Sequence, residues 1–152
     1  MEPRIDFYKA APDGINAMRG LERAVNQSGL EGSLRELVKL RVSQMNGCAY
    51  CIDMHTKDAR AAGESEQRLY ALNAWRETPF YTERERAALE WTEAITNIAV
   101  RHAPDDVFFR VRQYFNESEL VNLTLAIVAI NGWNRLAIGF RAVPGSYQPK
   151  PA

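Results

Sequence analysis

The sequence has no excess of charge of either sign. Its 152 residues include 19 lysines and arginines and 19 aspartates and glutamates. A nucleic-acid-binding domain carries a basic excess or a basic stripe, because it must contact phosphates. We therefore expect no nucleic-acid partner for this chain.

The sequence also lacks a long uninterrupted apolar segment. No apolar stretch follows the charged residues of 1–6, so we expect no signal peptide. The longest apolar run, 120–130, is interrupted by Asn122 and Thr124; it is too short to cross a bilayer and predicts a buried helix. We expect no membrane association and a cytoplasmic location, where closely spaced cysteines are more typical of catalysis or metal binding than of structure.

Strand patterns and domain boundaries are absent as well. No segment alternates between apolar and polar residues with a period of two, as a half-buried strand does. No linker, low-complexity stretch or change of composition divides the chain, and 152 residues with 46% apolar content are enough for one core. We predict an all-α fold, with a single domain over 1–152 built as a bundle of about six to eight helices.

Residues that start and stop helices place these elements along the chain. Apolar positions three and four residues apart, from Ile15 to Val25, predict a helix that ends at Ser28-Gly29. The pattern Ser/Thr-x-x-Glu predicts capping boxes at 33–36 and 82–85, and 116–119 caps the last helix. The helix from 82 is expected to bury Ala88, Trp91, Ile95 and Ile98. The expected helices are 15–28, 33–44, 48–62, 65–74, 82–100, 104–114 and 116–140, with 1–11 and the end of the chain from Pro144 irregular.

Thiols and imidazoles are scarce, and most of them lie together. The only two cysteines form Cys48-Ala49-Tyr50-Cys51, and His55, one of two histidines, follows four residues later. Two such thiols can close a disulfide or bind a metal, and a histidine at i+4 from Cys51 lies on the same helix face. The thiolate is the attacking form of cysteine, and the N-terminus of a helix stabilises its negative charge. A histidine can accept the proton that the thiol loses. After attack on a peroxide, a second thiol can convert the sulfenic acid to a disulfide. The pattern therefore favours a thiol redox site at the start of a helix.

A carboxylate is expected beside this histidine. If the helices on either side of Asn46-Gly47 form an antiparallel hairpin, residues equally far from the turn face each other. Glu36 lies roughly ten residues before the turn, at about 1.5 Å per residue, and should face positions around 55 to 58. Its carboxylate could then orient the His55 imidazole and stabilise its charged form.

Other interpretations of these residues remain open. Glu36 could serve only as the capping partner of Ser33, and the two thiols could be inert and buried. A zinc site is possible if His102 folds back to join Cys48, Cys51 and His55, although structural zinc usually draws on two such cysteine pairs. Trp133, between Asn131 and Asn134, is expected to pack in the core rather than to form a pocket wall near the thiols.

These motifs resemble a known family. Glu36, the Cys48-Ala49-Tyr50-Cys51 pair and His55, together with Asn131-Gly132-Trp133-Asn134-Arg135, are similar to the alkylhydroperoxidase D-like branch of the carboxymuconolactone decarboxylase superfamily. The resemblance covers about residues 15 to 145 and is densest at 36–63. It implies an all-helical bundle that forms dimers or trimers of dimers, and peroxide reduction with electrons returned by a thiol or dihydrolipoyl partner. One departure is Tyr50, which stands where that branch has a second histidine and puts efficient turnover in question.

The sequence thus predicts a peroxiredoxin-type alkylhydroperoxidase, an antioxidant oxidoreductase with no bound cofactor or metal. The predicted catalytic residues are Cys48, Cys51, His55 and Glu36, with Cys51 as the attacking thiol and Cys48 as the resolving thiol. The helix-end argument instead favours Cys48 as the more acidic thiol. Two alternatives are a redox-sensing or binding protein that uses the same thiols without turnover, and a zinc-stabilised helical domain.

Overall fold

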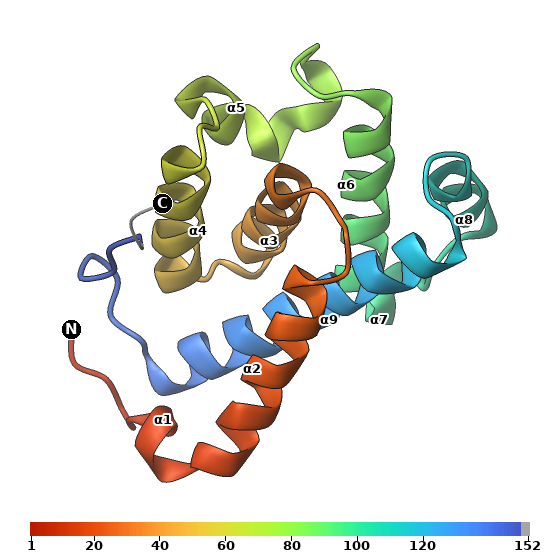
Figure 1. Ribbon diagram of the computed structural model, residues 1–152. Helices are drawn as coiled ribbons and strands as arrows, with labels where there is room; N and C mark the ends of the chain where they lie inside the picture. Colours follow the sequence, from red (N-terminus) through yellow and green to blue (C-terminus); the bar gives the residue numbers. More distant parts are fainter. Residues whose placement is uncertain (150–152) are drawn as a thin grey trace.

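The computed structural model describes residues 1–149, with Arg101 described only in its backbone, and is helical throughout (Figure 1). Nine α-helices lie within the described residues, more than expected because α1 and α7 are single turns. The α-helices are α1 (Phe7–Ala10), α2 (Pro12–Asn26), α3 (Gly32–Asn46), α4 (Ala49–Ala61), α5 (Glu66–Ala71), α6 (Glu83–Thr96), α7 (Ile98–Arg101), α8 (Asp105–Arg112) and α9 (Glu117–Phe140). A 3-10 helix, η1 (Leu72–Glu77), follows α5 directly.

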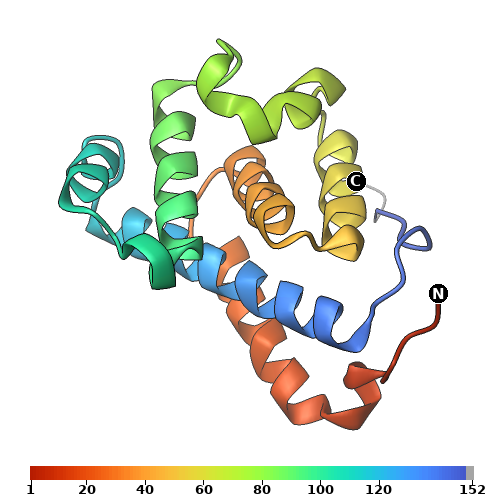
Figure 2. The same ribbon diagram turned by 180° about the vertical axis from the view of Figure 1, so that it is seen from behind.

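Helix α3 lies in the middle of the molecule and is surrounded by α4, α6 and α9, as both views show (Figures 1 and 2). A helix covered on several sides must be apolar around most of its circumference. The side chains of Leu37, Val38, Leu40 and Val42 are accordingly inaccessible to solvent. The redox motif follows directly after this central helix, so its position is fixed by the core of the protein.

Two of the three predicted N-terminal helix caps are confirmed. Thr82 and Glu85 form the predicted capping box at the start of α6, and Asn116 and Glu119 cap α9 in the same way. Gly63 follows α4 with a φ of 94°, a conformation that glycine adopts without steric cost.

Two predicted boundaries are wrong. The helix predicted over 65–74 continues as η1 to Glu77. The helix predicted over 82–100 ends at Thr96, and the separate turn α7 follows. Ile98 is therefore half-exposed, whereas Ala88 and Trp91 are buried as expected.

The N-terminal residues are more ordered than predicted, because Phe7 begins the short helix α1. Its ring is buried, with its centroid 5.8 Å from that of Phe140 at the end of α9. The backbone N–H of Arg4 donates to the carbonyl of Phe140 at 2.9 Å. The first residues of the chain are thereby held against the C-terminal end of α9, beside the redox motif.

Helix α9 is the one helix of residues 1–149 that is long and apolar enough to cross a membrane. It is longer than the apolar run at 120–130 because its apolar character continues to Phe140. It packs on α2, α3 and α6, and it buries Leu123, Ile127 and the polar Asn134. One face of α9 is therefore buried, as predicted for the run at 120–130, while Val121, Val128 and Ile138 remain about half-exposed.

Candidate active site

The turn between α3 and α4 places the two cysteines. Gly47 ends α3 in the left-handed conformation with a φ of 68°, which favours glycine. The N–H of Cys48 donates to the carbonyl of Ser43 at 2.9 Å, and Cys48 is the N-cap residue of α4. The predicted break at Asn46-Gly47 and the predicted cysteine at a helix N-terminus are both confirmed.

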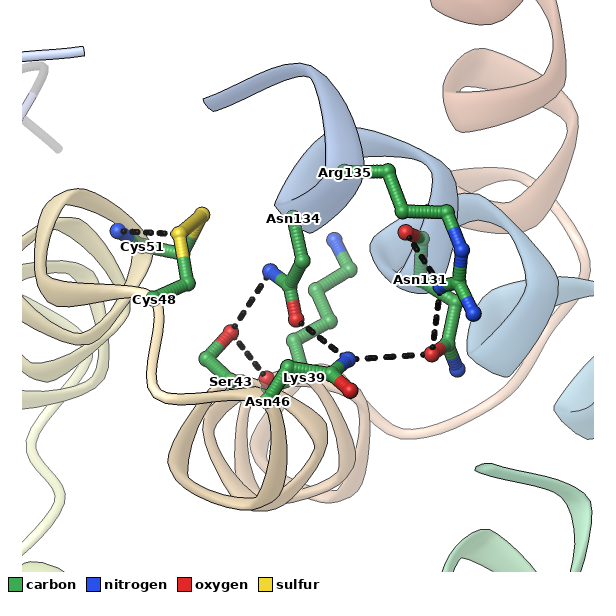
Figure 3. The surroundings of a disulfide bond; sticks show 8 residues. All are labelled: Lys39, Ser43, Asn46, Cys48, Cys51, Asn131, Asn134 and Arg135. Carbon is green, nitrogen blue, oxygen red and sulfur yellow. Dashed lines mark hydrogen bonds between the residues drawn. A yellow bond between two sulfur atoms is a disulfide. The ribbon is translucent and has the colours of Figure 1, made fainter. Parts of the chain in front are cut away.

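Cys48 and Cys51 are joined by a disulfide, with their Cα atoms 5.3 Å apart (Figure 3). The N–H of Cys51 donates to Sγ of Cys48 at 3.4 Å. Helix N-terminal N–H groups stabilise negative charge, so this position favours a Cys48 thiolate once the disulfide is reduced. Both residues are buried, with relative exposures of 1% and 2%, so a reactant must reach the sulfurs through an opening between side chains.

His55 and Glu36 lie in direct contact, as the hairpin geometry predicts. Nδ1 of His55 is 2.8 Å from Oε2 of Glu36, and His55 is only 5% exposed. The carboxylate accepts this hydrogen bond, so Nδ1 carries the proton and Nε2 of a neutral ring keeps its lone pair. Among the described residues Nε2 has no hydrogen-bond partner although it is buried. It is therefore able to accept a proton from a reactant or a thiol.

The charges around Glu36 keep it ionised. Burial acts to raise the pKa of the Glu36 carboxyl, but the hydrogen bond and charge of His55, with Lys39 and Arg35 nearby, hold this pKa below its ordinary value. Nζ of Lys39 lies 3.7 Å from Oε1 of Glu36 and also binds Glu22 on α2. An ionised Glu36 can both orient His55 and stabilise it when protonated.

The capping role predicted for Glu36 is wrong. Helix α3 begins at Gly32, one residue before Ser33, and its N-cap residue Glu31 makes no side-chain capping bond. Ser33 is thus inside the first turn, and the Glu36 side chain binds His55 on the neighbouring helix. Residues 33–36 match the capping-box pattern but make no capping box, because the helix starts earlier than the pattern indicates.

A cavity of about 820 Å³ opens beside Cys51 and His55. Its walls come from α1, α2, α3, α4 and α9 and include Tyr50 and Trp133. Trp133 also packs against the core, so it is both core and pocket wall, and the expectation of packing alone was incomplete. Cys48 lines a different, smaller cavity of about 320 Å³.

The end of the chain reaches the same site, which the sequence did not predict. The hydroxyl of Tyr147 donates to Oδ1 of Asp58 at 2.7 Å. Nζ of Lys57 donates to the carbonyl of Tyr147 at 3.1 Å, and the N–H of Gly145 donates to Oδ2 of Asp53 at 3.0 Å. We call residues 145–147 the C-terminal strap, since these contacts hold it along α4.

Asp58 of α4, which the strap holds, is a third acid–base group beside His55. Ligand atoms of Asp58, His55 and Glu36 all lie within 4.8 Å of one another. Burial, the hydrogen bond to Asp58 and the charges of Asp58 and Glu36 raise the pKa of Tyr147, so its hydroxyl stays protonated and holds the Asp58 carboxylate. No sequence signal marked this contact, because Tyr147 lies in an irregular segment 89 residues from its partner.

An amide network anchors the turn that carries the cysteines (Figure 3). Nδ2 of Asn46 donates to Oδ1 of Asn131 at 3.0 Å and to Oδ1 of Asn134 at 2.9 Å. Asn134 is fully buried, and its Nδ2 donates to Oγ of Ser43 at 3.2 Å. These bonds tie the last turn of α3 to α9 immediately before Cys48.

The residues proposed for a zinc site do not come together. His102 is exposed in the turn that follows α7, and Cys48 is bonded to Cys51. Within residues 1–149 the group able to hold a metal is instead Glu36, His55 and Asp58. The arrangement of Cys48, Cys51 and His102 therefore gives no support to a zinc-stabilised domain.

Comparison with known proteins identifies relatives along most of the chain. The profile of the Carboxymuconolactone decarboxylase family matches residues 10–94, which include the cysteine pair, Glu36 and His55. The uncharacterised protein YdfG of Bacillus subtilis is 50% identical over 138 residues, which are 91% of this chain and 94% of YdfG.

Solved structures show the same fold. A crystal structure from Agrobacterium tumefaciens, of a protein of unknown function provisionally assigned as the antioxidant defence protein AhpD, has a TM-score of 0.93 and 48% identity. The match covers 96% of this chain and all of that chain. The debrominase Bmp8 has a TM-score of 0.80 at 21% identity, over 91% of this chain and 74% of its own; this likeness concerns the fold alone.

Proposed function

Because the chain belongs to the carboxymuconolactone decarboxylase family and carries a cysteine pair beside a Glu36–His55 contact, we propose that it is a thiol-dependent peroxidase. The observation that carries this proposal is the buried imidazole: Nδ1 is held by a carboxylate at 2.8 Å, while Nε2 is unpartnered among the described residues. His55 lines the same cavity as Cys51. A thiol, a base and an orienting carboxylate are the groups that activate a cysteine nucleophile.

The proposed cycle starts from the two reduced thiols. His55 accepts the Cys51 proton on Nε2, and the thiolate attacks the terminal oxygen of a hydroperoxide. The O–O bond breaks, the S–O bond of a sulfenic acid forms, and the alkoxide leaves with the proton returned by His55. The Cys48 thiolate then displaces hydroxide, which is protonated to water, and the disulfide closes. A dithiol reductant restores both thiols by disulfide exchange, so one hydroperoxide and one dithiol give one alcohol, one water and one oxidised dithiol.

We assign the attacking role to Cys51 because Cys51, and not Cys48, lines the cavity that contains His55. Cys48 lies at the helix N-terminus, where the N–H groups stabilise its thiolate for the resolving step. Glu36 acts through His55 and is a positioning residue.

A coupled peroxide assay tests the proposal. Cumene hydroperoxide is supplied with dihydrolipoamide or dithiothreitol, and consumption is followed for the wild type, Cys48→Ser and Cys51→Ser. We expect turnover by the wild type and loss of turnover in Cys51→Ser. Wild-type turnover in both serine variants would contradict the proposal. A disulfide that titrates reversibly, without turnover of any peroxide, would favour the redox-sensing alternative.

The partners are part of the same proposal. We propose a hydroperoxide as substrate, a thiol or dihydrolipoyl group as reductant, and a homo-oligomer built from dimers. Helix α9 supports the oligomer, since Val121, Val128 and Ile138 are about half-exposed along it, and exposed apolar side chains favour association. Light scattering coupled to size-exclusion chromatography measures the mass of the protein in solution. A monomer at micromolar concentration would contradict the proposed oligomer. We expect activity in the cytoplasm, where such dithiol reductants are kept reduced.

A further inference from the structure

The cavity beside Cys51 contains more cationic than anionic side chains. Its lining includes the four cations Arg19, Arg23, Arg35 and Lys39, and the three carboxylates Glu22, Glu36 and Asp58. Each carboxylate already has a donor: Lys39 binds Glu22, His55 binds Glu36 and Tyr147 binds Asp58. The three arginines therefore provide positive charge that no carboxylate of the cavity neutralises by direct contact.

Among the described residues none of these arginines forms an ion pair. Arg19 makes a long bond of 3.4 Å to Oδ1 of Asn16, and its guanidinium lies 5.4 Å from the centre of the Tyr8 ring. Arg35 donates from Nη1 to the carbonyl of Leu30, while its Nε is buried and has no partner within residues 1–149. A buried donor without an acceptor is costly, and an acceptor from a ligand relieves that cost.

The arginines come from two helices that face the same space. Arg19 and Arg23 lie one turn apart on α2, and Arg35 lies in the first turns of α3. Guanidinium groups present planar pairs of N–H donors that match the two oxygens of a carboxylate. A cavity wall that combines an excess of positive charge, four cations against three carboxylates, with such donors attracts and holds a small anion.

Apolar and aromatic groups line the rest of the cavity. Tyr8 of α1, Met54 of α4 and Trp133 of α9 contribute to the wall together with Phe7 and Ala137. The volume of about 820 Å³ falls in the range of sites that hold drug-sized organic molecules. Hydrogen peroxide would leave most of this space unused, so the cavity fits a larger molecule with an apolar body.

We propose that the cavity binds an organic hydroperoxide that carries a carboxylate, with its peroxide group at Cys51 and its carboxylate at Arg19, Arg23 and Arg35. This inference rests on the proposed peroxidase function and adds the substrate class. The carboxylate takes no part in the electron transfer. The peroxide O–O bond breaks, the two cysteine thiols supply two electrons, and the products are a hydroxy acid and water.

The first test compares an acid with its neutral ester. The kcat/KM of the wild type is measured for a fatty-acid hydroperoxide and for its methyl ester, with dithiothreitol as the reductant. We expect a preference of about 10-fold or more for the acid, the size of one or more charge-assisted hydrogen bonds. The double variant Arg19→Gln/Arg23→Gln should reduce this preference to nearly one. The control Arg110→Gln, on α8 and paired with Glu90 at 2.7 Å, should keep it.

Equal kcat/KM values for acid and ester in the wild type would overturn the inference, while turnover of both would leave the peroxidase function intact. A preference that survives in the double variant would also overturn it. The reductant is a second source of a carboxylate, so dihydrolipoate is compared with its neutral amide against cumene hydroperoxide. An acid preference confined to the reductant would assign the arginines to the reductant and overturn the substrate class.

A binding measurement does not depend on turnover. Titration calorimetry of the oxidised protein with decanoate and with decanol compares an anionic and a neutral ligand of the same length. We expect decanoate to bind at least about 10-fold more tightly, and the double variant to lose most of this difference. Equal affinities would overturn the anion site. Tight decanoate binding without turnover of any peroxide would support the site and contradict the peroxidase proposal.

Discussion

The two sulfur atoms of one disulfide have different surroundings. Cys51 borders the larger cavity, which contains His55, Glu36 and the arginines of α2 and α3. Cys48 borders the smaller cavity, whose wall, among the described residues, includes Ile138 and Val143 with Arg141 as its one charged side chain. Residues three apart on a helix lie side by side, yet each thiol here borders a different cavity. Helix position thus gives the two thiols different neighbours: Cys48 lies at the N-terminal N–H groups of α4, and Cys51 shares a cavity with His55 and Glu36.

Replacing each cysteine in turn is the strongest test of this division. In Cys48→Ser, the reduced protein should consume one equivalent of peroxide without added thiol and then stop, because the Cys51 sulfenic acid has no thiol to resolve it. In Cys51→Ser the fast reaction should be slower by at least about 100-fold, because the remaining thiol lacks the His55 base. Stopped-flow measurements and mass spectrometry of dimedone adducts give both results. A sulfenic acid on Cys48 in Cys51→Ser would reverse the roles.

The next largest effect on the peroxide reaction should appear when a variant in the larger cavity is compared with one in the smaller cavity. Glu36→Gln removes the charge that holds His55, and we expect kcat/KM for peroxide to fall about 10- to 100-fold. Val143→Thr changes the wall of the smaller cavity at a side chain that is 37% exposed, where a hydroxyl can reach solvent, and we expect less than about a twofold change. Steady-state kinetics at pH 7 measure both, and far-UV circular dichroism checks the fold. Similar losses in both variants would remove the difference between the two sides.

Glu36, which lines the larger cavity, should also make the free energy of unfolding depend on pH. The pKa of Glu36 is lowered in the folded protein relative to its ordinary value of 4.5. Its ionised form therefore adds stability above that value, and the contribution is lost as the pH falls through the lowered pKa. We expect the difference in unfolding free energy between the wild type and Glu36→Gln to shrink as the pH falls from 6 to 3.

Urea unfolding at several pH values measures this difference. Val143→Thr serves as the control, since no ionisable group is changed, and its curve should stay parallel to that of the wild type. A wild-type advantage over Glu36→Gln that grows on acidification would show that the sign is wrong.

The smallest expected effect comes from the C-terminal strap. Tyr147→Phe removes the hydroxyl that donates to Asp58, and we expect a loss of about 1 kcal/mol in unfolding free energy. The peroxide rate should change by less than about threefold at neutral pH, since Glu36 still holds His55. Asp58→Asn gives a second measure of the same bond. A loss of activity as large as that of Glu36→Gln would place the strap among the main positioning elements.

The sequence predicts this site well where the contacts are local. Glu36 and His55 are joined by a short hairpin, so counting residues from the turn is enough to place them opposite each other. The strap and the arginines are different, because their positions depend on how distant segments pack. Tyr147 lies in an irregular segment, and Arg19 and Arg23 occupy an ordinary exposed face of α2. No local pattern distinguishes such residues from solvated surface side chains.

The dipeptide Asn-Gly shows why local patterns are incomplete. Asn46-Gly47 ends α3, whereas Asn131-Gly132 lies inside α9 with the helix continuing on both sides. A Cβ built on Gly132 would lie 2.7 Å from Cε of Met18, so the glycine leaves room on α9 for the end of the Met18 side chain of α2. The same two residues therefore stop one helix and permit close packing in the other, and the surrounding structure decides between the two.

The strap has a consequence for how the site is made during protein synthesis. Asp58 is translated 89 residues before Tyr147, so both thiols are synthesised well before the strap that binds α4. During that interval the cysteines can be reduced or oxidised by solutes, but the final arrangement around His55 is not yet assembled. The contact to Asp58 therefore forms only after Tyr147 has been synthesised, and a nascent chain that stalls before the strap would carry the thiols without this contact.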